Sequence, residues 1–436
     1  MIVARDDYLN ELKSEMHNGL VKILTGIRRC GKSFILSVLF RNYLLESGVT
    51  PDHIIEVPLD RDEFKDCRDA IRLGEFIRSK IRHDGEWTYV FIDEVQLTRK
   101  VLPADIDLDR LAPEDREGAY LTFYDTLNGL RQTDRVDVYV TGSNSKMLSK
   151  DIDTNFADRG VQIQVRPFSF AEYCGALKPA DKAAAFGQYL IWGGMPLAVL
   201  EQDGRKRARY LKKLFSEVYL KDICKRYKLK DDYVLSRLVD VLSSAIGSLT
   251  NPHKLKNTIE SVLNTSPSDH TIANYLDYLK DSFLFDDAKR WEVKGKRYFD
   301  YPLKYYSVDP GLRNARLDFR DVEPSHSMEN VIFNELNARG CQVDVGVVEI
   351  SGRQHEIDFV VNRAPGKLYI QVALELTNKE KREQELLPLR KSDDFFRKMV
   401  VVRGYDPPRF SGDGIMEVGV IPFLLDKAIL DTALAD

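Results

Sequence analysis

Short apolar runs alternate with amphipathic stretches over the first 165 residues of the chain. The runs are rich in β-branched and aromatic side chains and predict strands at residues 20–24, 54–58, 88–92, 136–141 and 161–165. They are nearly continuous in apolar residues, which is typical of parallel strands that are covered on both faces. Because stretches with helical periodicity separate them, we predict a five-stranded α/β domain over residues 1–168.

The periodicity becomes helical in the middle of the chain and predicts a helical region at residues 169–249. Two further helices, which begin after Asn251 and after Ser268, are followed by an alternating stretch that is interrupted at Gly295. That interruption predicts a β-hairpin. Two helices and a hairpin in this order predict a winged helix-turn-helix, which we assign to residues 250–318.

The last third of the chain has the pattern of a second α/β unit, at residues 319–436. It starts with a predicted helix at residues 328–339, and a second helix is predicted at 380–391. The predicted strands lie at residues 343–350, 356–361, 367–374 and 399–403. Strands and helices alternate again here, so this unit is expected to have its own sheet.

Chain length and charge balance set limits on this organisation. A chain of 436 residues exceeds the size at which one hydrophobic core stops growing, so about two or three domains are expected. The 64 basic and 68 acidic residues give a net charge of -4, which neither favours nor excludes nucleic acid as a partner. The run from Arg205 to Lys230 is locally basic, and its charged face is either solvated or a contact for nucleic acid or another partner.

The cysteines and the apolar runs bear on the compartment. The five cysteines are scattered, odd in number and never form a CxxC pair, which is typical of reduced thiols rather than of disulfides or a zinc site. The amino-terminal segment lacks the apolar core of a signal peptide, and no apolar run approaches the roughly 20 residues that span a bilayer. We therefore expect a cytoplasmic protein without a membrane partner.

A phosphate-binding loop is predicted between the strand at residues 20–24 and an apolar helix. The loop has the pattern GxxxxGKS and comprises Gly26, Ile27, Arg28, Arg29, Cys30, Gly31, Lys32 and Ser33, with Phe34 opening the helix. Gly26 and Gly31 let the backbone approach an anion and adopt torsions that a side chain disfavours. Lys32 is expected to reach the β and γ phosphates of ATP, and Ser33 to bind Mg²⁺. ATP and Mg²⁺ are therefore the predicted cofactors.

Paired carboxylates follow the strand at residues 88–92 and suit hydrolysis of the bound nucleotide. Asp93 is expected to lie near Mg²⁺, through water, and Glu94 to orient or deprotonate the attacking water. Acidic residues after a strand mean little alone, but these follow the phosphate-binding loop by about sixty residues. The sequence therefore predicts a metal site at Ser33 and Asp93 and a catalytic Glu94.

Two further polar residues are candidates for catalysis. Asn144 follows the strand at residues 136–141 in a run of small polar residues, where it could sense the γ-phosphate or the attacking water. The alternative is a polar turn that caps the next helix. Arg159 precedes the last strand of the domain and could act as a finger on the nucleotide of an adjacent subunit, which requires a homo-oligomer. The alternative for Arg159 is a surface salt bridge.

Characteristic stretches run along nearly the whole chain: GIRRCGKS, FIDEVQ, TGSNSKML, RPFSFAEY, YLIWGGMP, YLKDICKRYK, TIANYLDYLKDSFLF, KYYSVDPGLRNA, ENVIFNEL, EIDFVV and YIQVALEL. With them the chain resembles the prokaryotic AAA-type P-loop ATPases that are related to the STAND signalling branch, whose C-terminal half is a domain of unknown function. The resemblance implies an α/β chain with a P-loop NTPase parallel-sheet domain, a helical and winged-helix middle, and a C-terminal restriction-endonuclease-like α/β domain.

The resemblance also implies where a nuclease site would lie. The endonuclease fold takes an acidic residue on its first helix, an aspartate on its second strand and an E-x-K on its third. Glu329 and Asp358 match the first two, but the third reads Gln371-Val372-Ala373. Because a hydrolytic metal site needs clustered carboxylates and a group that activates water, we expect a scaffold without nuclease activity. Glu356 and Glu375 are the acidic residues that could substitute for the missing carboxylate.

The predicted winged helix offers two surfaces for DNA. The exposed face of its second helix mixes polar, basic and acidic residues, namely His270, Asn274, Lys280, Asp269, Asp277 and Asp281. The hairpin is more basic and could hold backbone phosphates through Lys289, Arg290, Lys294, Lys296 and Arg297. A solvated hairpin is the alternative.

Two functional hypotheses follow. In the first, an ATP-hydrolysing AAA-type protein couples its nucleotide state to the binding or remodelling of nucleic acid. In the second, an ATP-gated signalling or regulatory scaffold turns over slowly and binds a protein or DNA partner without cutting it. DNA-stimulated hydrolysis with a steep salt dependence of binding would favour the first.

Overall fold

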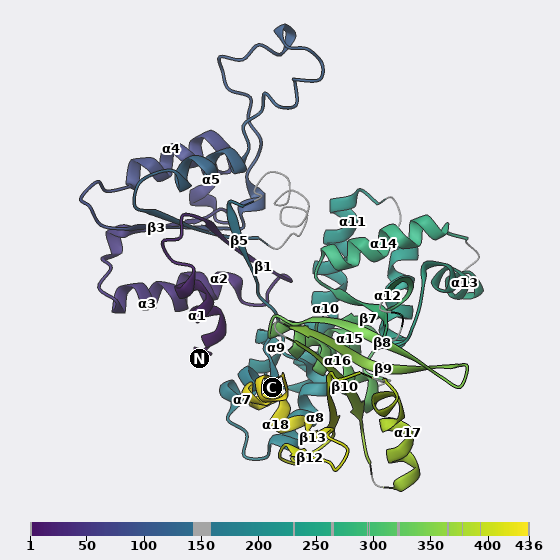
Figure 1. Ribbon diagram of the computed structural model, residues 1–436. Coiled ribbons are helices and arrows are strands. Elements are labelled where there is room, and N and C mark those ends of the chain that lie inside the picture. Colours follow the sequence, from purple (N-terminus) through teal and green to yellow (C-terminus); the bar gives the residue numbers. More distant parts are fainter. Residues whose placement is uncertain are drawn as a thin grey trace. The chain divides into compact units, whose positions relative to one another are not determined.

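The computed structural model describes residues 2–142, 158–229, 232–262, 266–293, 295, 297–320, 323–363, 366–376, 378–392 and 394–434. The chain divides into two compact units, Met1–Arg166 and Pro167–Asp436 (Figure 1). Each unit has its own sheet, of five and of eight strands. Among the described residues, no helix is long and apolar enough to cross a membrane.

The first unit is built on a parallel sheet. Its strands are β1 (Val21–Thr25), β2 (Ile54–Pro58), β3 (Thr88–Asp93), β4 (Val136–Thr141) and β5 (Gly160–Gln164). They are ordered β2-β3-β4-β1-β5, and every neighbouring pair is parallel. All five predicted strands are confirmed, with ends that differ by one residue at most.

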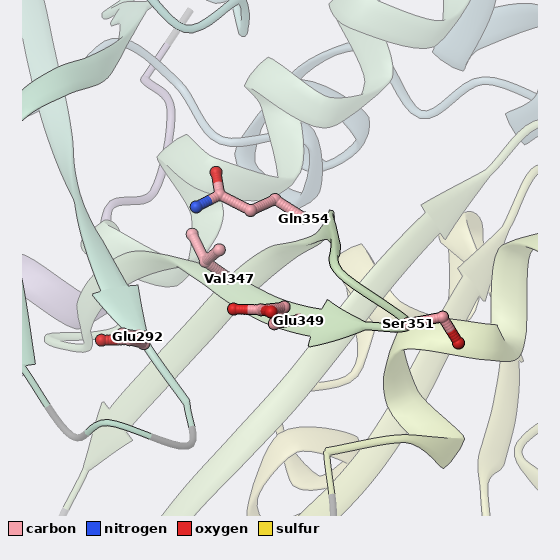
Figure 2. Close-up of a pocket in the computed structure, with 5 residues that line it drawn as sticks. All are labelled: Glu292, Val347, Glu349, Ser351 and Gln354. Carbon is pink, nitrogen blue, oxygen red and sulfur yellow. The ribbon is translucent and has the colours of Figure 1, made fainter.

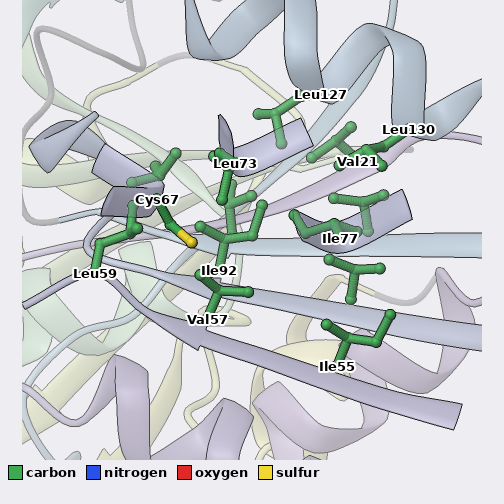
Figure 3. Packing of buried hydrophobic residues seen from close by; sticks show 14 of the residues in the cluster. Val21, Ile55, Val57, Leu59, Cys67, Leu73, Ile77, Ile92, Leu127 and Leu130 are labelled. Carbon is green, nitrogen blue, oxygen red and sulfur yellow. The ribbon is translucent and has the colours of Figure 1, made fainter. Parts of the chain in front are cut away.

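Helices cover both faces of this sheet because strand side chains alternate between the faces. On one face, α4 (Ala70–Lys80) and α5 (Phe123–Arg131) pack with the strand residues Val57, Ile92 and Val138 (Figure 3). On the other face, the ring of Phe40 packs against Phe91 and Tyr139. Phe40 belongs to one helix made of α2 (Lys32–Phe34), the π-helix η1 (Ile35–Phe40) and α3 (Arg41–Glu46), and α1 (Asp6–Ser14) lies against η1.

The second unit begins with helices, as predicted for the middle of the chain. They are α7 (Phe170–Leu177), α8 (Lys182–Trp192), α9 (Pro196–Leu200), α10 (Gly204–Lys213), the π-helix η8 (Leu214–Leu220), α11 (Lys221–Tyr227), α12 (Tyr233–Ser244), α13 (Pro252–Val262) and α14 (Asp269–Asp281). Ser268 caps α14 by accepting a hydrogen bond from the Thr271 N–H, as its position before an apolar helix predicts.

An eight-stranded mixed sheet forms the rest of this unit, in the order β12-β13-β11-β10-β9-β8-β6-β7. The strands are β6 (Phe285–Glu292), β7 (Arg297–Ser307), β8 (Gln342–Ile350), β9 (Arg353–Arg363), β10 (Gly366–Ala373), β11 (Arg397–Val402), β12 (Arg409–Phe410) and β13 (Met416–Gly419). The accompanying helices are α15 (Pro310–Arg316), α16 (Pro324–Ala338), α17 (Lys379–Arg390), α18 (Val420–Leu425) and α19 (Ala428–Leu434). The α/β fold class is therefore confirmed: a parallel-sheet domain, a helical middle and a mixed carboxyl-terminal sheet.

The predicted hairpin is present, but its pairing goes beyond the prediction. β6 and β7 pair antiparallel, and β6 also pairs in parallel with β8. The hairpin is thus part of the large sheet that the sequence analysis assigned to residues 319–436. Two helices, α13 and α14, followed by the hairpin keep the element order that predicts a winged helix, and the assignment of that fold remains a prediction.

A buried carboxylate joins two of the characteristic stretches inside the second unit. Asp309, 1% exposed, accepts hydrogen bonds from the N–H groups of Gly194 (2.6 Å) and Leu312 (2.9 Å). A Cβ on Gly193 would lie 2.2 Å from its Oδ1, so a glycine is needed there. Burial raises the pKa of Asp309 to about 6, although the backbone N–H groups of Gly194, Leu312, Gly311 and Met195 act to lower it.

Candidate functional site

The predicted phosphate-binding loop lies between the end of β1 and the start of α2. Gly26 has a φ of +133° and Gly31 a φ of +107°. A Cβ on Gly26 would lie 2.0 Å from the carbonyl oxygen of Val165, so only glycine fits. The helix that starts with α2 begins directly after Gly31, and its first backbone N–H groups are left for an anion.

The side chain of Lys32 folds back over this loop. Its Nζ donates to the carbonyl oxygens of Gly26 (2.9 Å) and Ile27 (3.0 Å), and the residue is only 5% exposed. A buried ammonium is strongly attracted to an anion because little water screens it. The geometry therefore provides a preformed positive charge at the centre of the loop.

Ser33, Asp93 and Thr141 meet at the carboxyl edge of the sheet. The hydroxyl groups of Ser33 (2.8 Å) and of Thr141 both donate to Oδ1 of Asp93. Sequence reasoning had included Ser33 and Asp93 but not Thr141. The signal for Thr141 was its position as the last residue of a strand next to β3, where parallel strands bring their ends together.

Hard oxygen donors of this kind fit Mg²⁺, which is held in nucleotide sites by one or two protein oxygens together with phosphates. The Ser33 hydroxyl and the Asp93 carboxylate are such donors. Within the part of the chain that the structure describes, no group of three or more His, Cys, Asp or Glu could hold a metal ion. A metal ion here would therefore also need the phosphates of a nucleotide.

Glu94 follows Asp93 in a left-handed conformation, with a φ of +56°. This region is disfavoured for a residue with a side chain and persists where the surroundings enforce it. The Glu94 N–H donates to Thr141 Oγ1 (3.1 Å), and the Gln96 amide donates to the Glu94 carboxylate. Burial raises the pKa of Glu94 and the neighbouring Asp93 adds to this, whereas Lys32 and Arg28 lower it. A carboxylate with a raised pKa is a better proton acceptor for an attacking water.

Arg5 stabilises the loop through hydrogen bonds that we call the brace, and it was not predicted from the sequence. It is 2% exposed, and its guanidinium donates to the carbonyl oxygens of Cys30 (2.9 Å) and Arg166 (2.8 Å). The Cys30 thiol donates to the Val165 carbonyl oxygen at 3.3 Å. These hydrogen bonds therefore connect the loop to the residues that follow β5. No local sequence pattern around Arg5 predicts contacts with residues so distant in the chain.

Comparisons with known proteins agree with this geometry. An uncharacterized protein of Haemophilus influenzae is 30% identical to this chain over 429 residues, 97% of this chain and 99% of that protein. Residues 18–174 match the model of a family described as an AAA domain. The chain is an AAA-family P-loop ATPase. Residues 183–323 match a domain of unknown function.

This AAA ATPase also matches a more distant protein sequence and a solved structure. An uncharacterized protein of Methanocaldococcus jannaschii is 22% identical over 378 residues, 83% of this chain and 76% of that protein. Among solved structures, a Walker-type ATPase of Pyrococcus abyssi aligns with a TM-score of 0.47 and 15% identity, covering 72% of this chain and 96% of the other.

Two predicted site residues of the AAA domain remain, Asn144 and Arg159. Asn144 lies outside the described residues. Arg159 is exposed and its carbonyl oxygen accepts from the Val21 N–H (3.0 Å), so it lies at the start of β5. The loop follows the opposite end of β1, about 16 Å away for five strand residues. A role for Arg159 across a subunit boundary remains a prediction.

A second charged cluster is buried in the other unit, at the position predicted for a degenerate nuclease site. Lys304 of β7, 3% exposed, pairs with Glu329 (2.9 Å), Glu356 (2.5 Å) and Asp358 (3.9 Å). Tyr306 donates to Glu329 at 2.7 Å. Glu356 is therefore part of the cluster. Burial lowers the pKa of Lys304, but the three carboxylates raise it more, so the net shift is upward.

The cluster differs from the predicted one in its source of positive charge. Lys304 lies on β7 of the hairpin and not on β10, the third strand of the domain, where an E-x-K lysine would lie. Gln371 is buried and its Oε1 has no hydrogen-bond partner among the described residues, while Glu375 is exposed. Burial and the neighbouring Glu329 raise the pKa of Asp358 far above its usual value, although Lys304 lowers it.

Carboxylates accompany the basic residues on the described part of the predicted hairpin. A pocket of about 280 Å³ there is lined by Glu292, Val347, Glu349, Ser351 and Gln354, and Figure 2 shows the two carboxylates on neighbouring strands. Arg290 is 9% exposed and donates to Gln354 at 3.0 Å, so it is not available to phosphates. Lys280 pairs with Asp277 (3.3 Å) and Asp287 (3.4 Å). Lys294 and Lys296 lie outside the described residues.

Proposed function

We propose that this AAA-family protein hydrolyses ATP in a Mg²⁺-dependent reaction and couples its nucleotide state to the binding of nucleic acid. The observation that carries the proposal is the meeting of Ser33, Asp93 and Thr141 beside the ammonium of Lys32. Separate elements supply these groups, and their shared edge is where ligands bind in parallel α/β sheets.

Each group has a role in phosphoryl transfer. The loop N–H groups and Lys32 bind the phosphates and offset the negative charge that develops on them. Bound Mg²⁺ would supply further positive charge to the β and γ phosphate oxygens, held by Ser33 and Asp93. Glu94 orients the attacking water and accepts its proton, and the Thr141 hydroxyl fixes both carboxylate-bearing residues through its two hydrogen bonds.

The brace beneath the loop supports coupling to the rest of the chain. Arg5 and Cys30 connect the loop to Val165 and Arg166, and the second unit begins at Pro167. A phosphate that enters the loop competes with the carbonyl oxygens for Lys32 and so changes the loop that this brace holds. Nucleotide binding thereby acts on the segment that leads into the second unit.

We further propose that the second unit is a winged helix at residues 250–318 joined to a nuclease-like domain at 319–436 that does not cut nucleic acid, after a helical region at 169–249. The support for this lack of activity is Lys304, whose ammonium occupies the centre of the Glu329, Glu356 and Asp358 cluster. An internal cation there competes with a metal ion for the same oxygens.

The test is steady-state ATP hydrolysis by the full-length protein, alone and with single- or double-stranded DNA. We expect DNA to stimulate the wild type, and Glu94→Gln to lose at least 100-fold in kcat while it still binds ATP, as is usual when a water-activating group is removed. Glu75→Gln, at an exposed glutamate of α4, is the matched control.

Two outcomes would argue against the proposal. If ATP binds but turns over negligibly with every nucleic acid, the ATP-gated scaffold that binds a partner without turnover is the better account. If Glu94→Gln hydrolyses ATP as fast as Glu75→Gln does, Glu94 has no role in the reaction.

A further inference from the structure

One long helix in the second unit has a rare irregularity at its centre. α10, η8 and α11 follow each other directly, and the junction residues Leu214 and Lys221 have right-handed helical torsions. Gly204–Tyr227 is therefore a continuous helix, about 35 Å long at a rise of ~1.5 Å per residue. Its middle seven residues, Leu214–Leu220, are π-helical, a form that is uncommon and is often found at functional sites.

The helix is basic on one face and apolar on the other. The side chains buried against the unit are Leu211, Leu214, Phe215, Tyr219, Leu220 and Ile223. The exposed basic residues are Arg205, Lys206, Arg209, Lys212, Lys213, Lys221 and Lys225, with Lys228 directly after the helix. We call these eight side chains the basic face. Glu217 is the exposed acidic residue of this helix.

The π-helical segment is what aligns the two ends of the basic face. A π-helix has more residues per turn than an α-helix, so each residue turns by roughly 20° less. Over seven residues this amounts to about 130°, relative to an uninterrupted α-helix. Without it, Lys221 and Lys225 would point about as far from Arg205 as the buried Leu214 does, and Ile223 would point outward. The burial pattern, with Ile223 at 0% exposure and Lys225 exposed, agrees with the realigned helix.

Most of the basic face is not neutralised by the protein itself. Lys212 pairs with Asp318 (2.6 Å) and Lys213 with Glu217 (3.6 Å). Within the ranges that the structure describes, the other six have no salt bridge: Arg205, Lys206, Arg209, Lys221, Lys225 and Lys228. Like charges in a row repel each other, so a bound polyanion would relieve this repulsion.

We propose that the basic face of Gly204–Tyr227 binds the phosphate backbone of double-stranded DNA. A duplex carries about one negative charge per 1.7 Å of its axis, so a straight row of cations about 35 Å long matches a full turn of about 34 Å. The face consists of cations with no amide side chains among them, and phosphate contacts of this kind position a duplex without reading its sequence. This inference rests on the proposed coupling to nucleic acid and names the surface that carries it.

The described residues of two other surfaces of the second unit, the hairpin and α14, fit a duplex less well. The hairpin has carboxylates at its pocket and a buried Arg290, and Lys280 of α14 is already paired with two aspartates. Six free cations predict that the logarithm of the binding constant falls against the logarithm of salt concentration with a slope of about -5.

The test uses the full-length protein and a fluorescently labelled, mixed-sequence duplex of roughly 20 base pairs, about two turns. Fluorescence anisotropy between about 50 and 200 mM KCl gives the salt slope. The variant Arg209→Gln/Lys221→Gln/Lys225→Gln is expected to bind more than tenfold more weakly, with a slope smaller by about 3. The control Lys178→Gln/Lys182→Gln/Lys391→Gln removes the same charge from exposed sites elsewhere in the unit, and should keep both values.

The outcomes separate this inference from the proposed function. A duplex that binds the wild type and stimulates its ATPase, but binds the two triple variants equally well, would overturn the basic face and leave the coupling intact. A wild type that binds no duplex, or that prefers an acidic peptide such as polyglutamate at equal charge, would overturn the basic face. It would overturn the coupling as well if neither single- nor double-stranded DNA stimulated ATP hydrolysis. Basal ATP hydrolysis should be unchanged in the triple variant, because none of its residues lies in the nucleotide site.

Discussion

Removal of the Lys304 ammonium should destabilise the second unit by about 3–5 kcal/mol at neutral pH. Lys304 is 3% exposed and has carboxylate oxygens of Glu329 and Glu356 at 2.9 and 2.5 Å. At such separations one pair attracts by ~6 kcal/mol with an effective dielectric constant near 20, before desolvation is subtracted. Lys304→Met keeps most of the aliphatic stem, so the loss reports the charge. Glu329 and Asp358 would remain buried without a counter-charge.

The pH dependence of this loss follows from which groups titrate. The pKa of Lys304 is raised in the folded protein, so its contribution is fully present below the pKa of a free lysine and is constant between about pH 5 and 9. In Lys304→Met, the uncompensated carboxylates bind protons more tightly in the folded state than in the unfolded one. The variant should therefore recover stability as pH falls from about 8 to 5, and the gap to the wild type should narrow.

Urea unfolding, followed by circular dichroism and tryptophan fluorescence, measures this loss at each pH. Adding Glu329→Gln to Lys304→Met should restore part of it, and Lys391→Met, at an exposed lysine, should change stability by less than about 0.5 kcal/mol. Millimolar Mg²⁺ should stabilise Lys304→Met more than the wild type, because the oxygens that held the ammonium become available. A loss below about 1 kcal/mol at pH 8 would refute the view that Lys304 neutralises this cluster.

Three further predictions concern the loop and the buried Asp309. Gly26→Ala should lower affinity for a fluorescent ATP analogue at least tenfold. The added Cβ would lie 2.0 Å from the Val165 carbonyl oxygen, and the backbone torsion would add ~1–2 kcal/mol of strain. Unchanged affinity in a titration would show that the loop can adjust. Arg5→Ala should weaken the same binding and lower the free energy of unfolding by about 1.5–3 kcal/mol for each charged hydrogen bond lost. If urea unfolding shows unchanged stability, the hydrogen bonds of Arg5 do not hold the loop. The pKa of Asp309, about 6 when folded against 3.8 ordinarily, means that the folded state binds this proton more tightly. Asp309 therefore stabilises the folded state fully below about pH 4, and this stabilisation of up to ~3 kcal/mol is lost as pH rises through about 6. Asp309→Asn should remove this loss from the pH dependence of urea unfolding. An equal pH dependence in both proteins would contradict the prediction.

The elements that the sequence predicted are those whose pattern is local. A strand such as β3 is a continuous apolar run, and the GxxxxGKS loop carries its glycines and Lys32 within eight residues, so both follow from neighbouring positions. β12, with only two residues, and β13 have no such pattern and were not predicted. Their pairing depends on where other strands of the sheet lie.

Contacts between distant parts of the chain escaped the sequence analysis for the same reason. Arg5 reaches Arg166, 161 positions away, and nothing around either residue indicates the other. Lys304 was not predicted because the lysine of the E-x-K pattern was expected two residues after Gln371, on the third strand. Lys304 instead lies on β7 of the hairpin. The parallel pairing of β6 with β8 joins the hairpin to the sheet that carries the carboxylates. Pairing between strands so far apart in sequence is set by the packing of the whole unit.

The π-helical segment Leu214–Leu220 has a consequence for how this chain can vary in length. Substitutions on the exposed side of Gly204–Tyr227 change charge one position at a time and leave the apolar side in place. Gain of a single residue within the segment instead rotates everything beyond it by about 100°, which would turn Ile223 outward and Lys225 inward. The helix should therefore accept many exchanges of side chain but no added residue between residues 214 and 220.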